Sequence, residues 1–126
     1  MKDDDSIDIN DIRSRERFTY RDDILCFKNI GLDNTVENRA PLKIVVENIS
    51  YSGIGIICSR PVTVGSMLVF NINNGQEVRE MMLEVKWCQR KQDAHHAGLQ
   101  FIGLKRPDIY FLHEMVNKSK KENNKN

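Results

Sequence analysis

The chain has 126 residues, of which 40% are hydrophobic and 29% charged, and its formal net charge is +1. This length suits one domain with a modest core, and the near-neutral charge excludes a general electrostatic attraction to nucleic acid or membranes. No stretch supplies the ~20 apolar residues that a membrane-spanning helix needs, and the acidic N-terminus lacks the apolar segment of a secretion signal. We therefore expect one domain without a membrane span.

The three cysteines support a cytoplasmic location. Cys26, Cys58 and Cys88 are an odd number and form no CxxC pair. Such a set fits a reducing compartment better than a disulfide framework. We interpret each cysteine as a small core or strand residue.

The two ends of the chain differ in composition from the middle. Residues 1–12 are acidic, whereas residues 119–126 are basic and contain no apolar side chain. Neither segment can bury enough apolar surface to offset the entropy of ordering. We expect two disordered tails around a domain at 13–118.

An arginine-rich segment opens the predicted domain. Arg13 and Arg15 are followed by Arg17 and Arg21, which form an RxxxR pattern. Guanidinium groups present planar forks of N–H donors that suit phosphate oxygens and the O6/N7 edge of guanine. Arginine pairs at this spacing are common on solvated surfaces, so the segment indicates a site for such a ligand only together with a second motif.

The middle of the chain shows the period-2 alternation of half-buried strands. Apolar residues alternate over 42–47 and 68–72, and a hairpin signal follows at 73–75. Met81, Leu83, Val85 and Trp87 fall on one face of a further strand. Short strands separated by Gly or Asn turns favour an antiparallel barrel over βαβ units.

A helix is expected only near the C-terminus. Pro107 suits a first helical turn, and Asp108 complements the helix dipole there. Ile109, Leu112 and Val116 then share one face. The sequence thus predicts a mostly β protein, a six-stranded antiparallel β-barrel with a C-terminal α-helix.

A second polar motif follows the strand at 42–47. Asn48, Ser50 and Gly53 form a (D/N)xSxxG pattern, which offers short hydrogen-bonding side chains and a position for close backbone approach. RxxxR followed by (D/N)xSxxG resembles the PilZ domain, a bacterial receptor for the second messenger cyclic di-GMP. The later Gly98-Leu99-Gln100-Phe101 segment is similar to the Gly-x-x-Phe ending of that family's late strand pair.

The resemblance implies a role for each motif residue. Arg17 and Arg21, on a segment just before the first strand, are expected to contact phosphate and the guanine Hoogsteen edge. Asn48 and Ser50 are expected to hydrogen-bond the other guanine edge. Gly53 is expected to let the backbone turn there without a side chain in the way. Neither Arg21 nor Ser50 is expected in the core.

Further residues extend this candidate site or alter its charge. Arg13 and Arg15 are possible additional ligand arginines. Trp87 is expected in the core, with stacking on guanine as the alternative. Three carboxylates, Glu16, Asp22 and Asp23, flank the arginines and lower the local electrostatic potential. The resemblance leaves open whether one cyclic di-GMP or an intercalated pair binds.

The sequence offers no cofactor, metal or catalytic set. His95 and His96 are adjacent on an extended segment, so their rings are expected on opposite faces, and no nucleophile–base pair or phosphate-binding glycine loop is present. An enzyme is therefore not expected.

The function that the resemblance implies is a cyclic di-GMP receptor that changes conformation and signals through a protein partner in motility, adhesion or biofilm control. One alternative is a PilZ-like interaction module that binds no nucleotide. A barrel that binds single-stranded nucleic acid is disfavoured by the near-neutral charge and the few aromatics among the basic residues.

Overall fold

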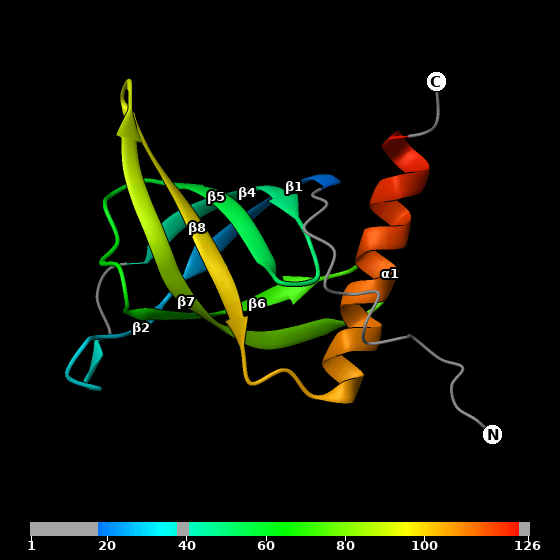
Figure 1. Cartoon of the computed structure of the whole chain (residues 1–126), viewed down its shortest axis with the longest axis horizontal. Helices are drawn as coiled ribbons and strands as arrows, with labels where there is room; N and C mark the ends of the chain where they lie inside the picture. Colours follow the sequence, from blue (N-terminus) through cyan, green and yellow to red (C-terminus); the bar gives the residue numbers. More distant parts are fainter. Residues whose placement is uncertain (1–17, 38–40, 124–126) are drawn as a thin grey trace.

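The computed structural model describes residues 18–37 and 41–123, which form one curled antiparallel sheet and one helix (Figure 1). The helix, α1, spans Arg106–Asn123 and stands at one side of the sheet. The strands are β1 (Phe18–Cys26), β2 (Lys28–Ile30), β3 (Val36–Glu37), β4 (Leu42–Ile49), β5 (Gly53–Cys58), β6 (Met67–Asn73), β7 (Val78–Lys91) and β8 (Ala94–Ile102).

The sheet has the order β1-β4-β5-β8-β7-β6-β2-β3. The prediction of a mostly β fold with a C-terminal helix is confirmed, but the six-stranded closed barrel is wrong. The described residues form eight strands, and β1 and β6 are in contact without being hydrogen-bonded neighbours. The difference arises at Phe27, where the first extended segment breaks: β1 pairs with β4 before the break, and β2 pairs with β6 after it.

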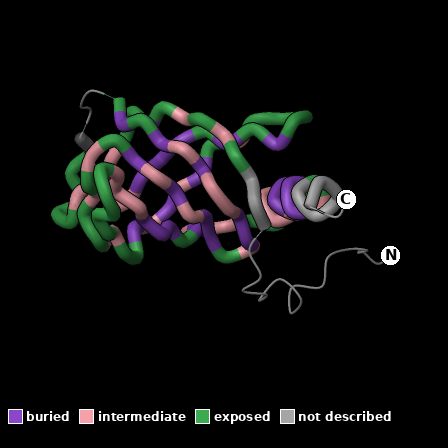
Figure 2. Tube along the Cα trace, turned by 90° about the horizontal axis from the view of Figure 1, so that it is seen from above, coloured by how far each residue is buried: buried purple, intermediate pink, exposed green. Residues whose placement is uncertain are grey.

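The interior of the curled sheet is the hydrophobic core (Figure 2). The predicted alternation is confirmed in β4 and β6, because their apolar residues point inward and are at most 5% exposed: Leu42, Ile44, Val46, Leu68, Phe70 and Ile72. The predicted hairpin at 73–75 joins β6 to β7. Asn74 Oδ1 accepts the backbone N–H groups of Gln76 and Glu77 at 2.9 Å, and Gly75 supplies a φ of 95°.

The core position predicted for Trp87 is wrong. Met81, Leu83 and Val85 point inward and are at most 3% exposed, but Trp87 is 47% exposed. The pairing of β7 with β8 shifts register between Val85 and Trp87, so Lys86 is an extra residue in β7. A β-bulge of this kind reverses the in–out alternation, which turns Trp87 to the outer face.

The start of α1 is fixed by Asp108. Its Oδ2 accepts the backbone N–H of Lys105 at 2.9 Å, and its Oδ1 accepts Arg79 Nε at 2.9 Å from β7. The first contact is the reach-back bond of a capping box, so it satisfies a donor at the helix end. The helix continues to Asn123 and so includes residues 119–123 of the segment that the sequence predicts to be a tail.

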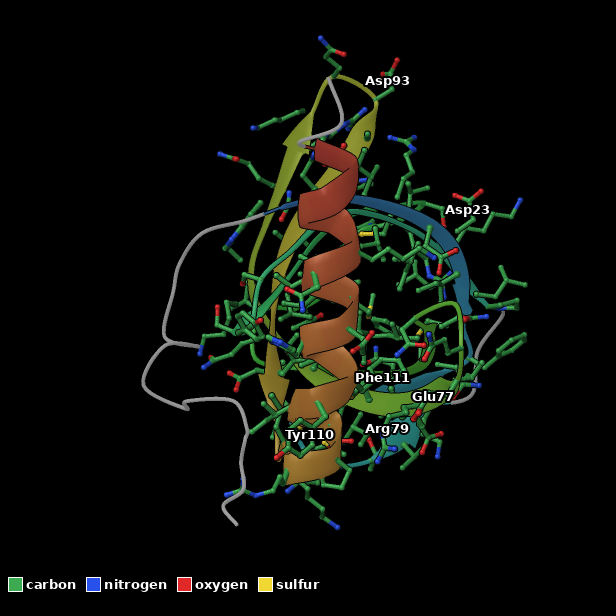
Figure 3. All side chains as sticks on the ribbon, turned by 90° about the vertical axis from the view of Figure 1, so that its right-hand side faces the viewer. Asp23, Glu77, Arg79, Asp93, Tyr110 and Phe111 are labelled. Atoms are coloured by element: carbon green, nitrogen blue, oxygen red, sulfur yellow. The ribbon has the colours of Figure 1, made fainter. Side chains whose placement is uncertain are left out.

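One face of α1 closes the core (Figure 3). Leu112 and Val116 are buried as predicted, together with Phe111 and Met115, whereas Ile109 is only partly buried. No helix in the described part of the chain is long and apolar enough to cross a membrane.

Replacing Leu112 with alanine should lower the free energy of unfolding by ~2–5 kcal/mol, because it leaves a cavity where a fully buried side chain packs. Denaturant unfolding measures the loss. Glu114→Ala, on the exposed face of the same helix, is the control and should change stability little. Equal effects of the two substitutions would contradict the packing of α1 on the core.

Candidate ligand-binding face

The (D/N)xSxxG motif forms the end of β4, a tight turn and the start of β5. Ser50 is 1% exposed, and its Oγ accepts the backbone N–H groups of Ser52 and Gly53, each at 3.3 Å. The backbone N–H of Ser50 in turn donates to the Gly53 carbonyl at 2.9 Å. Ser50 is therefore a buried turn residue, and the expectation that it lies outside the core is wrong.

Gly53 is required by the close approach of β8. A Cβ at this position would overlap the backbone carbonyl oxygen of Leu99 and lie 3.1 Å from the Cα of Gln100. A hydrogen bond also joins the turn to β8 here, because the backbone N–H of Phe101 donates to the Ser52 carbonyl at 2.9 Å. The glycine of the motif thus allows the turn to pack directly on β8.

The turn is also bonded to the helix. Tyr51 Oη lies 2.7 Å from His113 Nδ1, and the two rings stack with centroids 6.1 Å apart. The other ring nitrogen of His113 lies 3.1 Å from Asn117 Nδ2. Partial burial raises the pKa of Tyr51, so its hydroxyl keeps its proton.

Four residues line up across the outer face of the sheet, and we call them the outer row. Register places Asn48 of β4 opposite Gly55 of β5, Gly55 opposite Gly98 of β8, and Gly98 opposite Trp87 of β7. A Cβ on Gly55 would lie 2.8 Å from Asn48 Nδ2, and one on Gly98 would lie 2.6 Å from Trp87 Cε2. The amide and the indole therefore lie over the two glycines, and about half of Trp87 faces solvent.

Arg21 lies at one end of this row. The sequence placed it before the first strand, but the structure places it within β1, where Tyr20 and Arg21 together oppose the single residue Glu47 of β4. Such bulges re-aim side chains and are common next to binding sites. Arg21 is exposed and forms no ion pair with any carboxylate in the described part of the chain.

Charged side chains of both signs surround the outer row. His96 Nδ1 lies 3.7 Å from Glu47 Oε1, and Lys86 Nζ lies 3.4 Å from Glu84 Oε2. The outer row with these neighbours offers an aromatic surface, an amide and nearby cations. These are the groups that a base and a phosphate require.

The structure brings together only some of the predicted site residues. Asn48 and Trp87 belong to the outer row and Arg21 lies beside it, whereas Ser50 and Gly53 lie in the turn that follows Asn48. Arg13, Arg15, Arg17 and Glu16 lie outside the described residues.

Sequence reasoning missed Gly55, Gly98, Glu47 and His96 as members of this face. They are distant from the motifs in sequence and reach the face through strand register. The conspicuous glycines in two predicted strands were the signal available, because a strand glycine often marks a close approach.

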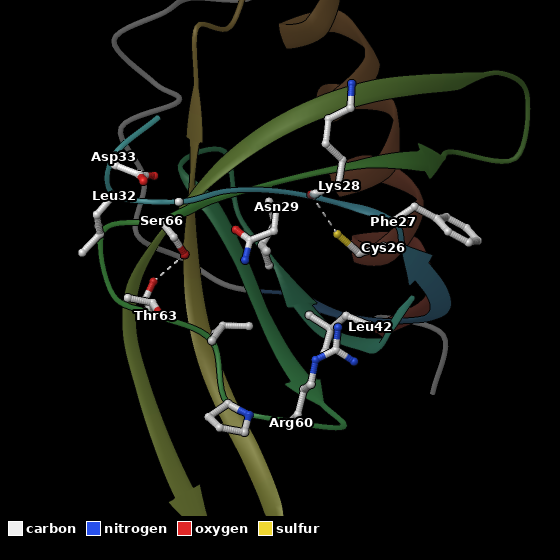
Figure 4. A pocket seen from close by; sticks show the side chains of 14 residues that line it. Cys26, Phe27, Lys28, Asn29, Leu32, Asp33, Leu42, Arg60, Thr63 and Ser66 are labelled. Atoms are coloured by element: carbon white, nitrogen blue, oxygen red, sulfur yellow. Dashed lines mark hydrogen bonds between the residues drawn. The ribbon is translucent and has the colours of Figure 1, made fainter. Parts of the chain in front are cut away.

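A separate pocket of about 400 Å³ lies near β2 and the 60–66 loop (Figure 4). Lys28, Arg60 and Leu32 contribute to its lining, and no residue of the outer row does. The Oδ1 atom of Asn29 in this pocket is buried without a hydrogen-bond partner among the described residues. The outer row is thus an open surface, distinct from this hollow.

The described residues contain no group of three His, Cys, Asp or Glu side chains that could hold a metal ion. His95 and His96 are both half-buried in β8, opposite Cys58 and Ile57 respectively. Cys26 and Cys58 are buried core residues, as predicted. Burial raises the pKa of Cys58 to about 11, so its thiol is unreactive at neutral pH.

Comparison with family models identifies one family, and solved structures of similar fold are also found. The family model described as PilZ domain matches residues 11–117. The PilZ domain of YcgR from Escherichia coli, solved with c-di-GMP, has a TM-score of 0.66 and 16% identity, over 90% of this chain and 95% of that chain. Another structure, YcgR in complex with c-di-GMP from the same organism, gives the same TM-score and identity but is covered over only 48% of its length. No curated protein matches the chain in sequence.

Ser50→Ala should lower the free energy of unfolding by ~1–3 kcal/mol, because it leaves the backbone N–H groups of Ser52 and Gly53 without their acceptor. Thr63→Ala removes an exposed hydroxyl outside this turn and should change stability by less than ~0.5 kcal/mol. Thermal or denaturant unfolding of the pair checks this, and equal stabilities would refute the turn role of Ser50.

Gly98→Ala should displace the Trp87 indole, because the new methyl group would occupy its place. Trp87 is the protein's single tryptophan, so its fluorescence reports the change directly. Gly103→Ala serves as the control variant, because nothing lies within 4 Å of its new methyl group, although the φ of 68° at this position adds strain. An emission spectrum that Gly98→Ala leaves unaltered would show that the indole does not lie over Gly98.

Proposed function

The chain belongs to the PilZ domain family, and on that premise we propose that it binds cyclic di-GMP on the outer face of β4, β5, β8 and β7. The observation that carries the proposal is the outer row, which has Asn48 at one end, the exposed Trp87 at the other and Arg21 beside it. Two structures of similar fold hold c-di-GMP, which supports this ligand.

Each side chain around the row has a chemistry that the ligand needs. Arg21, together with Arg17, would contact phosphate and the Hoogsteen edge of guanine through its planar fork of donors. Asn48 would hydrogen-bond the edge of the second guanine. The exposed part of the Trp87 indole would stack on a base, which turns the stacking alternative into the favoured role.

Ser50 and Gly53 would contribute to the same site mainly by shaping it. The hydroxyl of Ser50 already serves the turn, and Gly53 permits the contact with β8. Together they fix the end of β4, on which Asn48 stands. Arg13 and Arg15 would add positive charge, and either one cyclic di-GMP or a stacked pair would occupy the face.

The proposed output is a change of conformation read by a protein partner. Phosphate contacts would draw the arginine-bearing segment onto the sheet and so change the conformation of the receptor. The receptor would act in the cytoplasm, without catalysis, through a partner that controls motility, adhesion or biofilm formation.

The rival function is a PilZ-like interaction module that binds no nucleotide. It is favoured by the carboxylates close to Arg21: Asp22 and Asp23 follow it on β1, and Glu47 lies opposite the bulge. These negative charges would repel an anionic ligand. In the receptor they would lower the affinity for cyclic di-GMP, and in the interaction module they would prevent binding.

Calorimetric titration of the full chain with cyclic di-GMP distinguishes the two functions. We expect binding heat and a raised unfolding temperature at saturation, because a ligand that binds only the folded state stabilises it. Linear pGpG and GTP should bind more weakly. No heat and no stabilisation at saturating cyclic di-GMP would leave the interaction module as the function.

Arg21→Ala should weaken cyclic di-GMP binding by ~2 kcal/mol, since it removes charge-assisted hydrogen bonds. Trp87→Ala should cost ~1–3 kcal/mol through lost base stacking, and Trp87→Phe should restore part of that loss. Lys91→Ala, at the exposed far end of β7, removes one positive charge away from the site and serves as the control. If either Arg21→Ala or Trp87→Ala binds as tightly as the parent, that residue does not belong to the site.

A further inference from the structure

The pocket of about 400 Å³ lies where three segments meet: residues 26–33, the start of β4 and the 60–66 loop (Figure 4). Its buried apolar part consists of Cys26, Leu42 and Leu68, which are at most 5% exposed. Phe27 and Leu32 also line the pocket and are 59% and 68% exposed, so they belong to its rim. A mostly apolar hollow of this volume is within the usual range of small-molecule sites.

The walls of the pocket are held by contacts within the protein. The backbone N–H of Gly65 donates to the Val85 carbonyl at 2.8 Å, and the N–H of Val85 donates to the Ser66 carbonyl at 2.9 Å. The loop is therefore bonded to β7. The loop also touches the β2–β3 hairpin, because a Cβ on Gly65 would lie 3.0 Å from Leu32 Cδ2. A ligand would enter a formed site and would pay little to order it.

One polar atom inside this pocket lacks a partner. Asn29 lies in β2 between two strands, opposite Glu37 of β3 and Leu68 of β6, so its position is fixed on both sides. Its Oδ1 is buried without a hydrogen-bond partner among the described residues, and Figure 4 shows the amide among the side chains that line the pocket. A buried acceptor without a donor is costly. An N–H donor of a ligand would remove that cost.

The charge inside the pocket comes from Arg60. Burial raises the pKa of Cys26, and the positive charge of Arg60 opposes part of that rise, so this charge acts on the buried part of the pocket. Figure 4 shows the side chain of Lys28 pointing away from the other lining side chains. Asp33 is the one carboxylate among the described residues that line the pocket, and its Oδ1 accepts the N–H of Thr35 at 3.1 Å in the hairpin turn. One guanidinium matches one carboxylate of a ligand.

We propose that this pocket binds a small organic carboxylate that also carries an N–H donor and an apolar group. The carboxylate would accept hydrogen bonds from the planar fork of Arg60, and the N–H would donate to Asn29 Oδ1. The apolar group would pack on the buried part of the pocket. An N-acylated amino acid has all three features. The pocket shares no residue with the outer row, so binding there is independent of the proposed function.

The chain's own tails fit this pocket less well. The five aspartates within residues 1–11 also carry carboxylates. The chain enters β1 at Phe18, and nine residues of strand then separate this point from the pocket by ~26 Å. Asp11, even fully extended, spans only ~24 Å from Phe18, and the aspartates before it would have to lie extended along the sheet at a cost in chain entropy. Residues 13–17 and 118–126 are basic, so Arg60 would repel them.

N-acetyl-L-leucine is the probe, because it combines a carboxylate, an amide N–H and an apolar side chain. Titrated into the full chain, it should shift the backbone amide signals of Asn29, Arg60 and Ser66 in a saturable way, with a dissociation constant of ~1 mM for a ligand of this size. N-acetyl-L-leucinamide lacks the charge and N-acetyl-N-methyl-L-leucine lacks the N–H, so each should bind about tenfold more weakly. Equal binding of the three compounds would overturn the proposal.

Substitutions test the two polar contacts in the protein. Arg60→Gln should weaken binding of N-acetyl-L-leucine about tenfold. Lys28→Gln removes a neighbouring charge whose side chain points away from the pocket, and it should leave binding nearly unchanged. Asn29→Leu should abolish the preference for the probe over its N-methylated analogue. It should not lower the unfolding temperature of the free protein, because the lost acceptor has no partner there.

Equal effects of Arg60→Gln and Lys28→Gln would show that only the general positive potential attracts the probe, against the proposal. A lower unfolding temperature for Asn29→Leu would assign the amide to the fold and contradict its role as ligand acceptor.

A full-length variant tests the acidic segment of the chain as the occupant. It carries Asp3→Asn, Asp4→Asn, Asp5→Asn and Asp8→Asn. We expect it to bind N-acetyl-L-leucine within about twofold of the parent, because exposed charges away from a site contribute little. Binding about fivefold tighter or more would show that this segment competes for Arg60 at high local concentration, and it would overturn the assignment of the pocket to a small carboxylate.

Discussion

The contact of backbone on backbone at Gly53 is the constraint on which the candidate site depends. Because this position has no side chain, the turn after β4 packs on β8, and the Ser50 hydroxyl holds the turn in that shape. The contact fixes how β5 registers with β8. It thereby aligns Gly55 with Gly98, so that the outer row exists only because the motif turn lies where it does.

Three bulges then decide which side chains reach the outer face. One opposes Tyr20 and Arg21 to Glu47, a second makes Glu47 an extra residue of β4 against β5, and the third inserts Lys86 into β7. Without the third bulge, the indole of Trp87 would enter a core that Val85 and Leu83 already fill. The same device that interrupts regular pairing thus supplies the aromatic surface, which is how sheets commonly build sites without loops.

The sequence predicted what depends on local pattern and missed what depends on pairing between distant segments. Alternation located the inward faces of β4 and β6, and the Asn-Asn-Gly hairpin was confirmed, because both features are written in consecutive residues. The alternation places Trp87 in the core, because a bulge reverses the in–out order of a strand without any mark in the sequence. The motif predicts that Ser50 faces the ligand, because a serine whose hydroxyl caps a turn and one whose hydroxyl binds a base can occupy the same position in the motif. The break at Phe27, which splits the first strand, likewise follows from tertiary pairing.

The Tyr51–His113 contact joins the motif turn to a helix that is far away in the sequence. Loss of the helix would therefore remove a partner of the turn as well as the lid of the core. The two parts form one cooperative unit, so we expect no partly unfolded state in which the turn persists while α1 is detached. A protein fused after α1 would be connected to the turn of the candidate ligand face by this phenol–imidazole contact, in addition to the packing of α1 on the core.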